Sequence, residues 1–183
     1  MTTKTKKILL ICALALLAAA LLFFGYRKGV ELYNTKNAEE LFAAGDYAGA
    51  RAWYEKNGSA EDIARCDYEL NREAYEAAEA QLAAGEYDAA RLAFEALGDF
   101  EDAADRALEC SFLKARALTD AGSYTGALDV LAVLPEGYAG AEELTGDAKE
   151  GLYQQALAAT YECRMDEAIM LWNSLGSYKD SDS

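Results

Sequence analysis

The chain has 183 residues, and its 32 Asp and Glu outnumber its 17 Lys and Arg, so the formal net charge is −15. It contains no His, which excludes Ser-His-Asp hydrolases, papain-like cysteine proteases and His-ligated zinc sites. This acidity also argues against extensive nucleic-acid binding, because phosphate contacts rest on clustered Lys and Arg.

The first part of the chain holds a candidate membrane segment. Residues 8–24 read ILLICALALLAAALLFF, and eleven of these seventeen residues are Ile, Leu or Phe. A helix of this length spans about 25 Å, close to the bilayer hydrocarbon thickness of about 30 Å. The sequence therefore predicts a short basic tail at residues 1–7 and a transmembrane helix at residues 8–25 that acts as a signal anchor.

The same segment also has features of a cleaved signal peptide. Ala18, Ala19 and Ala20 are small residues of the kind that precede a cleavage site, and cleavage would make the chain a secreted protein. Bulky apolar residues follow at 21–24, whereas a cleavage site normally lies in a polar segment beyond the apolar core. We therefore favour an uncleaved anchor.

Basic residues on both sides of the apolar segment predict its orientation. Lys4, Lys6 and Lys7 precede it, and Arg27 and Lys28 follow it. The excess on the N-terminal side predicts a cytoplasmic tail and a single pass through the cytoplasmic membrane, with the C-terminal domain extracytoplasmic. Without these five basic residues the chain keeps 12 basic and 32 acidic residues, a charge of −20. This acidity fits a solvated surface, or a surface for cations or basic partners.

The remainder of the chain contains an internal repeat. A Gly, an acidic or polar residue and a Tyr recur at spacings of 40 and 37 residues, and a weaker copy follows 41 residues later. The copies are Gly45-Asp46-Tyr47, Gly85-Glu86-Tyr87, Gly122-Ser123-Tyr124 and Cys163-Arg164-Met165. Such periodicity is typical of repeat proteins, in which each unit packs on its neighbours.

Small and large residues stand at fixed offsets from each copy. An Ala lies seven residues before it, another Ala five residues after its first position, and a bulky apolar residue four further on. These positions are Ala38, Ala78, Ala115 and Ala156; Ala50, Ala90, Ala127 and Ala168; and Tyr54, Phe94, Leu131 and Trp172. The pattern predicts pairs of closely packed helices, with the large residue filling the groove beyond the small ones.

A second type of turn follows each bulky residue. Residues 58–62 and 98–102 combine a helix-ending Gly with polar capping residues, and we expect capping boxes at Ser59/Asp62 and Asp99/Asp102. The turns predict helices at about 30–44, 47–57, 60–84, 87–97, 100–121, 124–134, 139–161 and 165–175. No segment alternates as a strand would, so we expect an all-α fold of helical hairpins.

These offsets resemble the tetratricopeptide repeat (TPR). The likeness covers about residues 31–180 and is closest to a bacterial variant with a longer first helix and a Gly-Asp-Tyr-Lys-Asp-like turn, here at 98–102 and 176–180. It implies a protein-binding scaffold of unspecified partner, in which the transmembrane helix precedes an α-solenoid of about four TPR-like hairpins at residues 26–180, with a tail at 181–183. Unit lengths of 37–41 residues rather than 34 depart from the family.

The resemblance also suggests where a partner would bind. Family members that grip a peptide C-terminus use Lys, Asn and Arg on their inner helices, whereas the corresponding helices here offer Glu39, Glu40, Glu79 and only Arg116. An acidic groove would suit a basic or neutral polar segment, although solvation alone also explains these glutamates. We take Glu39, Glu79 and Arg116 as candidate partner-binding residues.

Trp172 is a further candidate because of its place near the C-terminus. The turn at 176–180 resembles those that open earlier helices, yet the sequence stops at Ser183. The surface around Ile169, Leu171 and Trp172 is therefore expected to be partly exposed. Three causes would explain the missing capping helix: the chain is a fragment of a longer protein, its tail is frayed, or this end docks onto a second copy or a partner.

No feature of the sequence predicts an enzyme, a cofactor or a metal site. The acidic residues fall at helix ends and outer faces rather than in one desolvated cleft, and the acidic cluster at 99–105 lacks the Gly and distal Glu of an EF-hand. The Tyr content leaves a secreted or envelope glycan-binding protein as the alternative function. Tyr47, Tyr87 and Tyr124 nevertheless occupy equivalent repeat positions, which favours a packing role.

The cysteines give no zinc signature. Cys66, Cys110 and Cys163 lie beyond the membrane segment without a CxxC pair, and we expect buried free thiols at helix interfaces rather than a disulfide.

Overall fold

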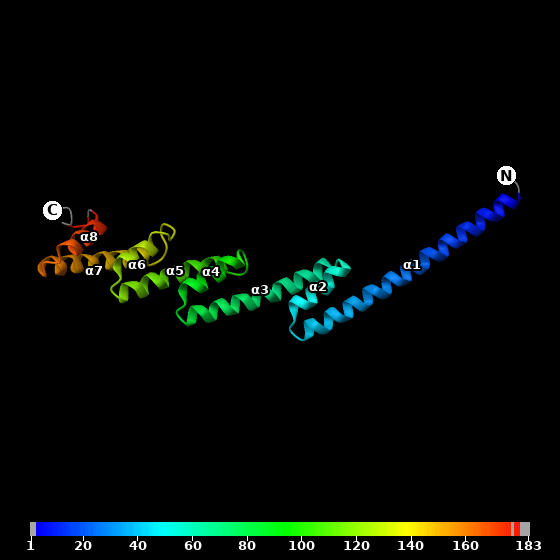
Figure 1. The fold of residues 1–183 in the computed structure, drawn as a ribbon, viewed down its shortest axis with the longest axis horizontal. Coiled ribbons are helices and arrows are strands. Elements are labelled where there is room, and N and C mark those ends of the chain that lie inside the picture. Colours follow the sequence, from blue (N-terminus) through cyan, green and yellow to red (C-terminus); the bar gives the residue numbers. More distant parts are fainter. Residues whose placement is uncertain (1–2, 177, 180–183) are drawn as a thin grey trace. The chain divides into compact units, whose positions relative to one another are not determined.

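The computed structural model describes residues 3–176 and 178–179, and within them the chain forms eight α-helices and no β-strand (Figure 1). The prediction of an all-α fold is confirmed for this part of the chain. The helices are α1 (Thr3–Ala43), α2 (Tyr47–Asn57), α3 (Ala60–Ala83), α4 (Tyr87–Leu97), α5 (Ala103–Asp120), α6 (Tyr124–Leu131), α7 (Ala141–Tyr161) and α8 (Met165–Leu175).

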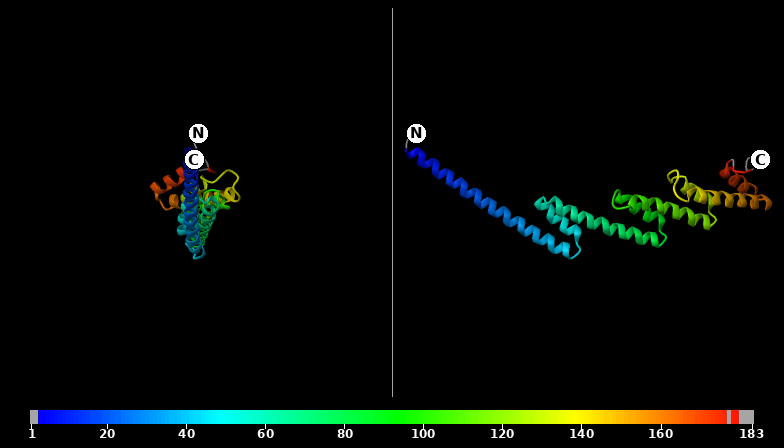
Figure 2. Two further views of the ribbon diagram at one scale, coloured as in Figure 1. Left: turned by 90° about the vertical axis from the view of Figure 1, so that its right-hand side faces the viewer. Right: turned by 180° about the vertical axis from the view of Figure 1, so that it is seen from behind.

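Helix α1 is one uninterrupted helix of 41 residues (Figure 2). The sequence predicts a membrane helix ending at residue 25 and a separate helix beginning near residue 30, and this separation is wrong. Gly25 and Gly29 lie in the joining segment, but a glycine inside a helix costs only about 1 kcal/mol and the segment has no proline to stop the backbone hydrogen bonds.

The N-terminal part of α1 has the exposure of a membrane span. Its apolar side chains face outward, from Leu10 at 62% exposure to Phe24 at 65%, and none of the apolar stretch is buried against the rest of the protein. By length and composition, α1 is the one helix among the described residues that is able to cross a bilayer.

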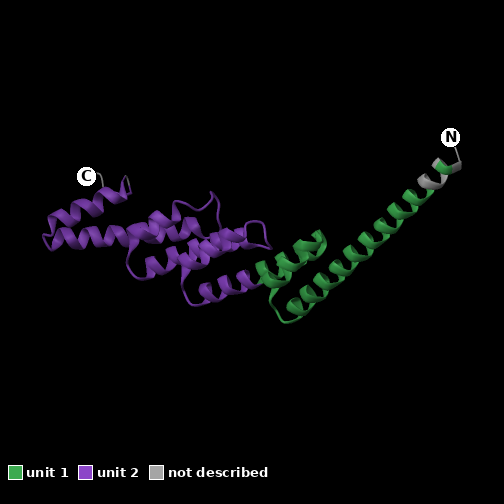
Figure 3. Cartoon of the chain, turned by 45° about the vertical axis from the view of Figure 1, so that its right-hand side comes forward, with its two compact units in different colours: residues 1–72 green, residues 73–183 purple. Residues whose placement is uncertain are grey.

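The chain divides into two compact units, residues 1–72 and 73–183, with the boundary inside α3 (Figure 3). In the first unit, α1 packs on α2 around a core of Ala38, Ala50, Tyr54 and Cys66. All four side chains are at most 1% exposed. The predicted packing of small residues around a large one is therefore confirmed in this unit.

The second unit contains three cores built on the same repeat positions. In each, consecutive helices pack together, and the Ala residues at the predicted offsets are at most 3% exposed. The cores centre on Ala78, Ala90 and Phe94; on Ala115, Leu131 and Leu144; and on Leu152, Ala156 and Leu175. Trp172 departs from the pattern because it is only half-buried, and Leu175, 6% exposed, is the large buried side chain of α8.

Helix α2 shows how the turns set the helix boundaries. Asp46 precedes its first turn, and the Asp46 Oδ1 accepts a hydrogen bond from the backbone N–H of Gly49 at 2.8 Å. Gly58 ends the helix in the left-handed conformation at φ 69°, which a residue without a Cβ adopts at no steric cost. The Ser59 hydroxyl donates a hydrogen bond to Asp62 Oδ2 at 2.5 Å, so these two side chains pair at the start of α3.

Three predicted boundaries in the second unit are wrong. Helix α5 begins at Ala103 rather than near 100, because Glu101 has φ 50° and Asp102 is the capping residue itself, so no Asp99/Asp102 capping box forms. Helix α6 ends at Leu131 because the next amides, at Val133 and Leu134, bond three residues back in tight turns. Helix α7 begins at Ala141, after Gly140 at φ 82°.

The turn before α5 is held by Tyr75 of α3. The Tyr75 hydroxyl donates to Asp102 Oδ1 at 2.5 Å, and this bond, followed by burial, raises the pKa of Tyr75 to about 12. The ring also packs edge-on against Phe94, with centroids 5.2 Å apart.

We expect this hydrogen bond to be lost at alkaline pH. Because the folded-state pKa of about 12 lies above the usual value of about 10, the bond contributes fully below pH 10 and its contribution falls as the pH rises toward 12. The difference in unfolding free energy between the wild type and Tyr75→Phe should therefore be constant at neutral pH and shrink between pH 10 and 12. Urea titrations of the full chain in detergent at several pH values measure it, and a constant difference throughout would contradict the assignment.

The cysteines are free, but they are not all buried. Cys66 and Cys110 have no exposed surface, and burial raises the pKa of both thiols. Cys163 is exposed in the turn before α8, with φ 57°, so the prediction of a buried thiol there is wrong. The turn needs a left-handed residue at this position, where the first three copies of the repeat have Gly.

We expect Cys163 to react with a maleimide more than about tenfold faster than Cys66 or Cys110, because thiol reactivity follows exposure and thiolate fraction. Mass spectrometry of peptides from the briefly labelled, folded full chain measures each site separately. Comparable rates at all three cysteines would contradict the observed burial.

Candidate functional site

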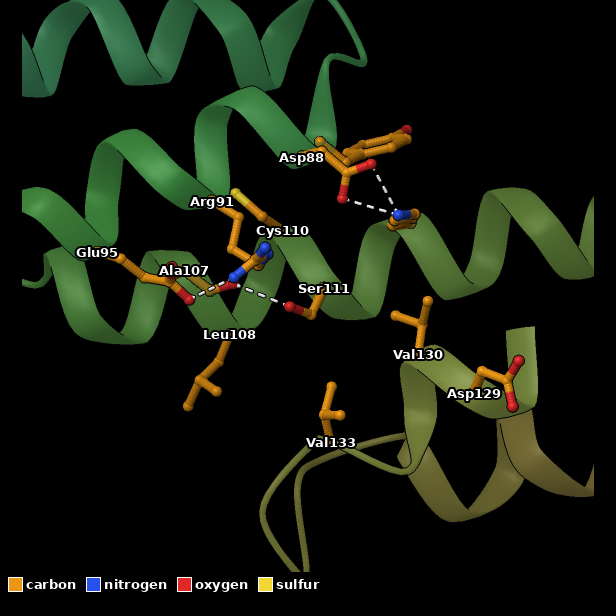
Figure 4. Close-up of a pocket in the computed structure, with 12 residues that line it drawn as sticks. Asp88, Arg91, Glu95, Ala107, Leu108, Cys110, Ser111, Asp129, Val130 and Val133 are labelled. Atoms are coloured by element: carbon orange, nitrogen blue, oxygen red, sulfur yellow. Dashed lines mark hydrogen bonds and ion pairs between the residues drawn. The ribbon is translucent and has the colours of Figure 1, made fainter. Parts of the chain in front are cut away.

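The second unit contains a groove of about 450 Å³ between α4, α5 and α6 (Figure 4). Helix α4 supplies one wall, α5 the floor, and α6 with the residues just after it the other wall. The lining residues include Asp88, Arg91 and Glu95 of α4; Ala107, Leu108, Cys110, Ser111 and Lys114 of α5; and Asp129, Val130 and Val133 on the α6 side.

Two ion pairs fix the α4 rim of the groove. Lys114 Nζ lies 2.7 Å from both carboxylate oxygens of Asp88, which links α5 to the first turn of α4. Arg91 Nη1 lies 2.5 Å from Glu95 Oε1 within α4. Surface pairs of this kind contribute little to stability, but they hold charged side chains at defined positions along the rim.

Away from these ion pairs, part of the groove lining is apolar. Leu108 and Val130 are half-buried, and Val133 is 73% exposed at the open end. Ser111 donates within α5 to the carbonyl of Ala107 at 3.3 Å, and burial keeps the Cys110 thiol protonated by raising its pKa. Apolar lining residues beside a charged rim are suited to holding apolar side chains of a ligand.

None of the candidate residues predicted from the sequence lines this groove. Glu39 is exposed on α1 in the first unit, and Arg116 is exposed on α5 in the second. Glu79 accepts from Arg106 Nε at 2.7 Å, so its carboxylate serves a link between α3 and α5. This pair, with Glu109 also bound to Arg106, raises the pKa of the guanidinium.

Trp172 belongs to a packed cluster. Its indole Nε1 donates to Thr160 Oγ1 at 3.2 Å, and its ring meets Tyr153 edge-on with centroids 5.3 Å apart. On the same helix, Ile169 and Met170 are exposed, at 57% and 64%. The predicted terminal turn at 176–180 is described only in part, because residues 177 and 180–183 lie outside the described residues.

The sequence contains only a partial signal for the groove. Arg91 and Glu95 are four residues apart, a spacing that predicts a pair on one helix face. Asp88 and Lys114 are 26 residues apart, and only the packing of α4 on α5 brings them together. No group of three or more Cys, Asp or Glu side chains in the described residues is arranged to hold a metal ion.

Comparison of the chain with protein-family models, with curated proteins and with solved structures gives no match.

Proposed function

We propose that the chain is a single-pass membrane protein whose TPR-like helical repeats form a scaffold that binds a protein partner at the cell envelope. The apolar, outward-facing part of α1 supports the anchor. The recurrence of buried Ala and large apolar residues at equal offsets in successive helix pairs supports the repeat architecture. The anchor would confine the scaffold near the bilayer and so raise its effective concentration there.

The groove between α4, α5 and α6 carries the proposal of protein binding. Its apolar lining residues, Leu108 of α5 with Val130 and Val133 on the α6 side, would take small apolar side chains of a partner segment. Its rim, where Asp88 and Glu95 are paired with Lys114 and Arg91, would fix polar groups of the same segment by hydrogen bonding. The acidic surface of the whole domain favours partners with basic flanks, since opposite charge speeds encounter.

Site-specific photocross-linking tests this function. A benzophenone amino acid replaces Val133 at the open end of the groove, and a matched variant carries it at Leu92, which is 57% exposed on α4 outside the groove. We expect a discrete cross-linked protein in native membranes from position 133 and not from position 92. A product of twice the chain's mass would identify a second copy as the partner. Equal products from both positions, or none from position 133, would contradict binding in the groove.

The proposed orientation is testable with the native Cys163. Among the described cysteines outside the proposed membrane segment, which holds Cys12, Cys163 is exposed whereas Cys66 and Cys110 are buried. A membrane-impermeant maleimide should therefore label the wild type in intact cells and leave Cys163→Ser unlabelled. Labelling only after lysis would place the repeats in the cytoplasm, and labelled protein in the medium would show the secreted alternative.

A second candidate function is glycan binding at the envelope. Tyr161, at the end of α7, is 82% exposed and presents an aromatic face suited to stacking on sugar rings. Retention of the protein on isolated wall material, abolished by Tyr161→Ala and kept by Val133→Asp, would favour this function over protein binding.

A further inference from the structure

A second groove, of about 340 Å³, lies in the first unit between α1 and the C-terminal end of α2. Phe24, Arg27, Lys28 and Glu31 line it from α1, and Lys56 and Asn57 line it from α2. We propose that this groove, termed here the juxtamembrane groove, binds the phosphate of an anionic phospholipid headgroup. The inference rests on the proposed membrane anchor and adds a specific lipid contact to it.

The walls of the juxtamembrane groove are held together by an amide network. Asn34 is 6% exposed, and its Nδ2 donates to Asn57 Oδ1 at 2.8 Å. Asn57 Nδ2 in turn lies 3.0 Å from the carbonyl of Glu31 and 3.0 Å from Thr35 Oγ1. The last residue of α2 is thereby fixed against α1, which keeps the neighbouring Lys56 beside the basic residues of α1.

The side chain of Lys56 is further oriented by aromatic contacts. Its Nζ lies 3.2 Å from the centroid of the Trp53 ring, a cation–π geometry. The Trp53 ring meets Tyr33 of α1 edge-on, with centroids 6.0 Å apart. The Lys56 ammonium group is therefore held over a half-buried indole at the α2 side of the groove.

The charge of the juxtamembrane groove is opposite to that of the rest of the domain. Three cations line it, and Glu31, which pairs with Lys28 at 3.0 Å, is the single lining carboxylate, leaving two positive charges. Residues after 28 otherwise carry a large acidic excess. A guanidinium and ammonium groups converging on one groove match a phosphate, which Arg binds bidentately and Lys binds as a point charge.

The position of the groove along α1 identifies lipid as the source of that phosphate. Phe24 is the last residue of the apolar run, and because α1 is continuous, Arg27 and Lys28 lie only about 4.5–6 Å further along the helix axis. The headgroup layer occupies about 5–7 Å beyond the hydrocarbon on each side. Tyr26, 74% exposed in the same turn, is a residue type enriched at this interface. The cations are therefore at phosphate depth whenever α1 spans the bilayer.

Native mass spectrometry of the full-length chain in detergent micelles tests the proposal. The micelles are titrated separately with phosphatidylglycerol, phosphatidylcholine and inorganic phosphate, and bound adducts are counted. We expect tighter retention of phosphatidylglycerol than of phosphatidylcholine. Lys56→Gln should weaken phosphatidylglycerol retention about fivefold, since a basic residue near a membrane surface contributes about 1 kcal/mol.

The matched control is Lys36→Gln, which removes a charge from an exposed site on α1 where Lys36 pairs only with Glu40, outside the groove. It should leave lipid retention unchanged, and Arg27→Lys should weaken it through loss of the bidentate contact. Equal weakening by Lys36→Gln and Lys56→Gln, or no preference for the anionic lipid, would overturn the proposal. Equally tight binding of inorganic phosphate, displacing the lipid, would assign the groove to a soluble anion instead.

Failure of the lipid contact is distinguishable from failure of the anchor. Resistance of the chain to carbonate extraction from native membranes measures membrane insertion independently of any lipid preference. Insertion without preference for phosphatidylglycerol overturns only the lipid contact. Complete extraction overturns the anchor, and the lipid contact with it.

Discussion

Replacing Phe94 with Ala is expected to destabilise the second unit by about 3–5 kcal/mol, the largest effect of any single substitution proposed for this chain. Phe94 has no exposed surface and packs with Ala78, Ala90 and Cys110. Its small neighbours cannot expand to fill the space that the ring leaves. The substitution therefore removes buried apolar surface and also leaves a cavity.

The neighbouring Cys110 provides a local measurement of this effect. Because Cys110 belongs to the same core, its rate of maleimide labelling in the folded full chain reports opening of that core. We expect a rise of more than about a hundredfold in Phe94→Ala, since about 2.7 kcal/mol corresponds to that factor. Leu92→Ala is the matched control, because Leu92 lies on the same helix but is 57% exposed. Similar labelling rates in the two variants would show that Phe94 does not hold this core.

Replacing Gly151 with Ala is expected to destabilise the contact between α6 and α7. A Cβ at Gly151 would lie 2.3 Å from two ring carbons of Tyr124, so the ring must leave its site. Overpacking of this kind costs about 1–3 kcal/mol, which outweighs the gain of about 1 kcal/mol in helix propensity only if the ring is held firmly. Tyr124 is packed with Leu152 and Leu128, so we expect net destabilisation.

Gly146 offers a control on the same helix. No atom lies within 4 Å of the Cβ that Gly146→Ala would add, so this substitution should stabilise the chain by about 0.5–1 kcal/mol. In a Tyr124→Ala background, Gly151→Ala should change sign and also become stabilising. Urea titrations of the full chain in detergent measure all four variants. A stabilising Gly151→Ala in the wild-type background would show that the ring moves aside freely.

The sequence predicts the repeat because its signal is local and periodic. Ala50 and Ala90 stand at one offset from successive turns, and both side chains are fully buried. A close helix pair tolerates only small side chains at its crossing point, so the constraint is visible without a structure. The same periodicity predicted Tyr54 and Phe94 as core residues, and both are buried.

The residues of the candidate groove could not be predicted from the sequence, because the groove depends on contacts between helices. From the sequence, Glu79 is interpreted as a solvated or partner-binding carboxylate, but in the structure it is bound by Arg106, 27 residues away. Lys114 and Asp88 are 26 residues apart, and the packing of α5 on α4 brings them together. Pairing of long charged side chains depends on the crossing geometry of the helices, and residue spacing along the chain does not encode it.

Because α1 is unbroken, its apolar N-terminal part and the helix pair that it forms with α2 belong to one rigid element. Between Phe24 and Ala43 the helix advances about 28 Å and turns about 100° per residue, and α2 is packed against its far end. If the apolar part is the proposed membrane anchor, its axial rotation or tilting would be transmitted directly to the α1–α2 hairpin. Inserting two helix-forming residues after Arg27 would turn that hairpin by about 200° about the α1 axis and direct it toward the opposite side of the anchor.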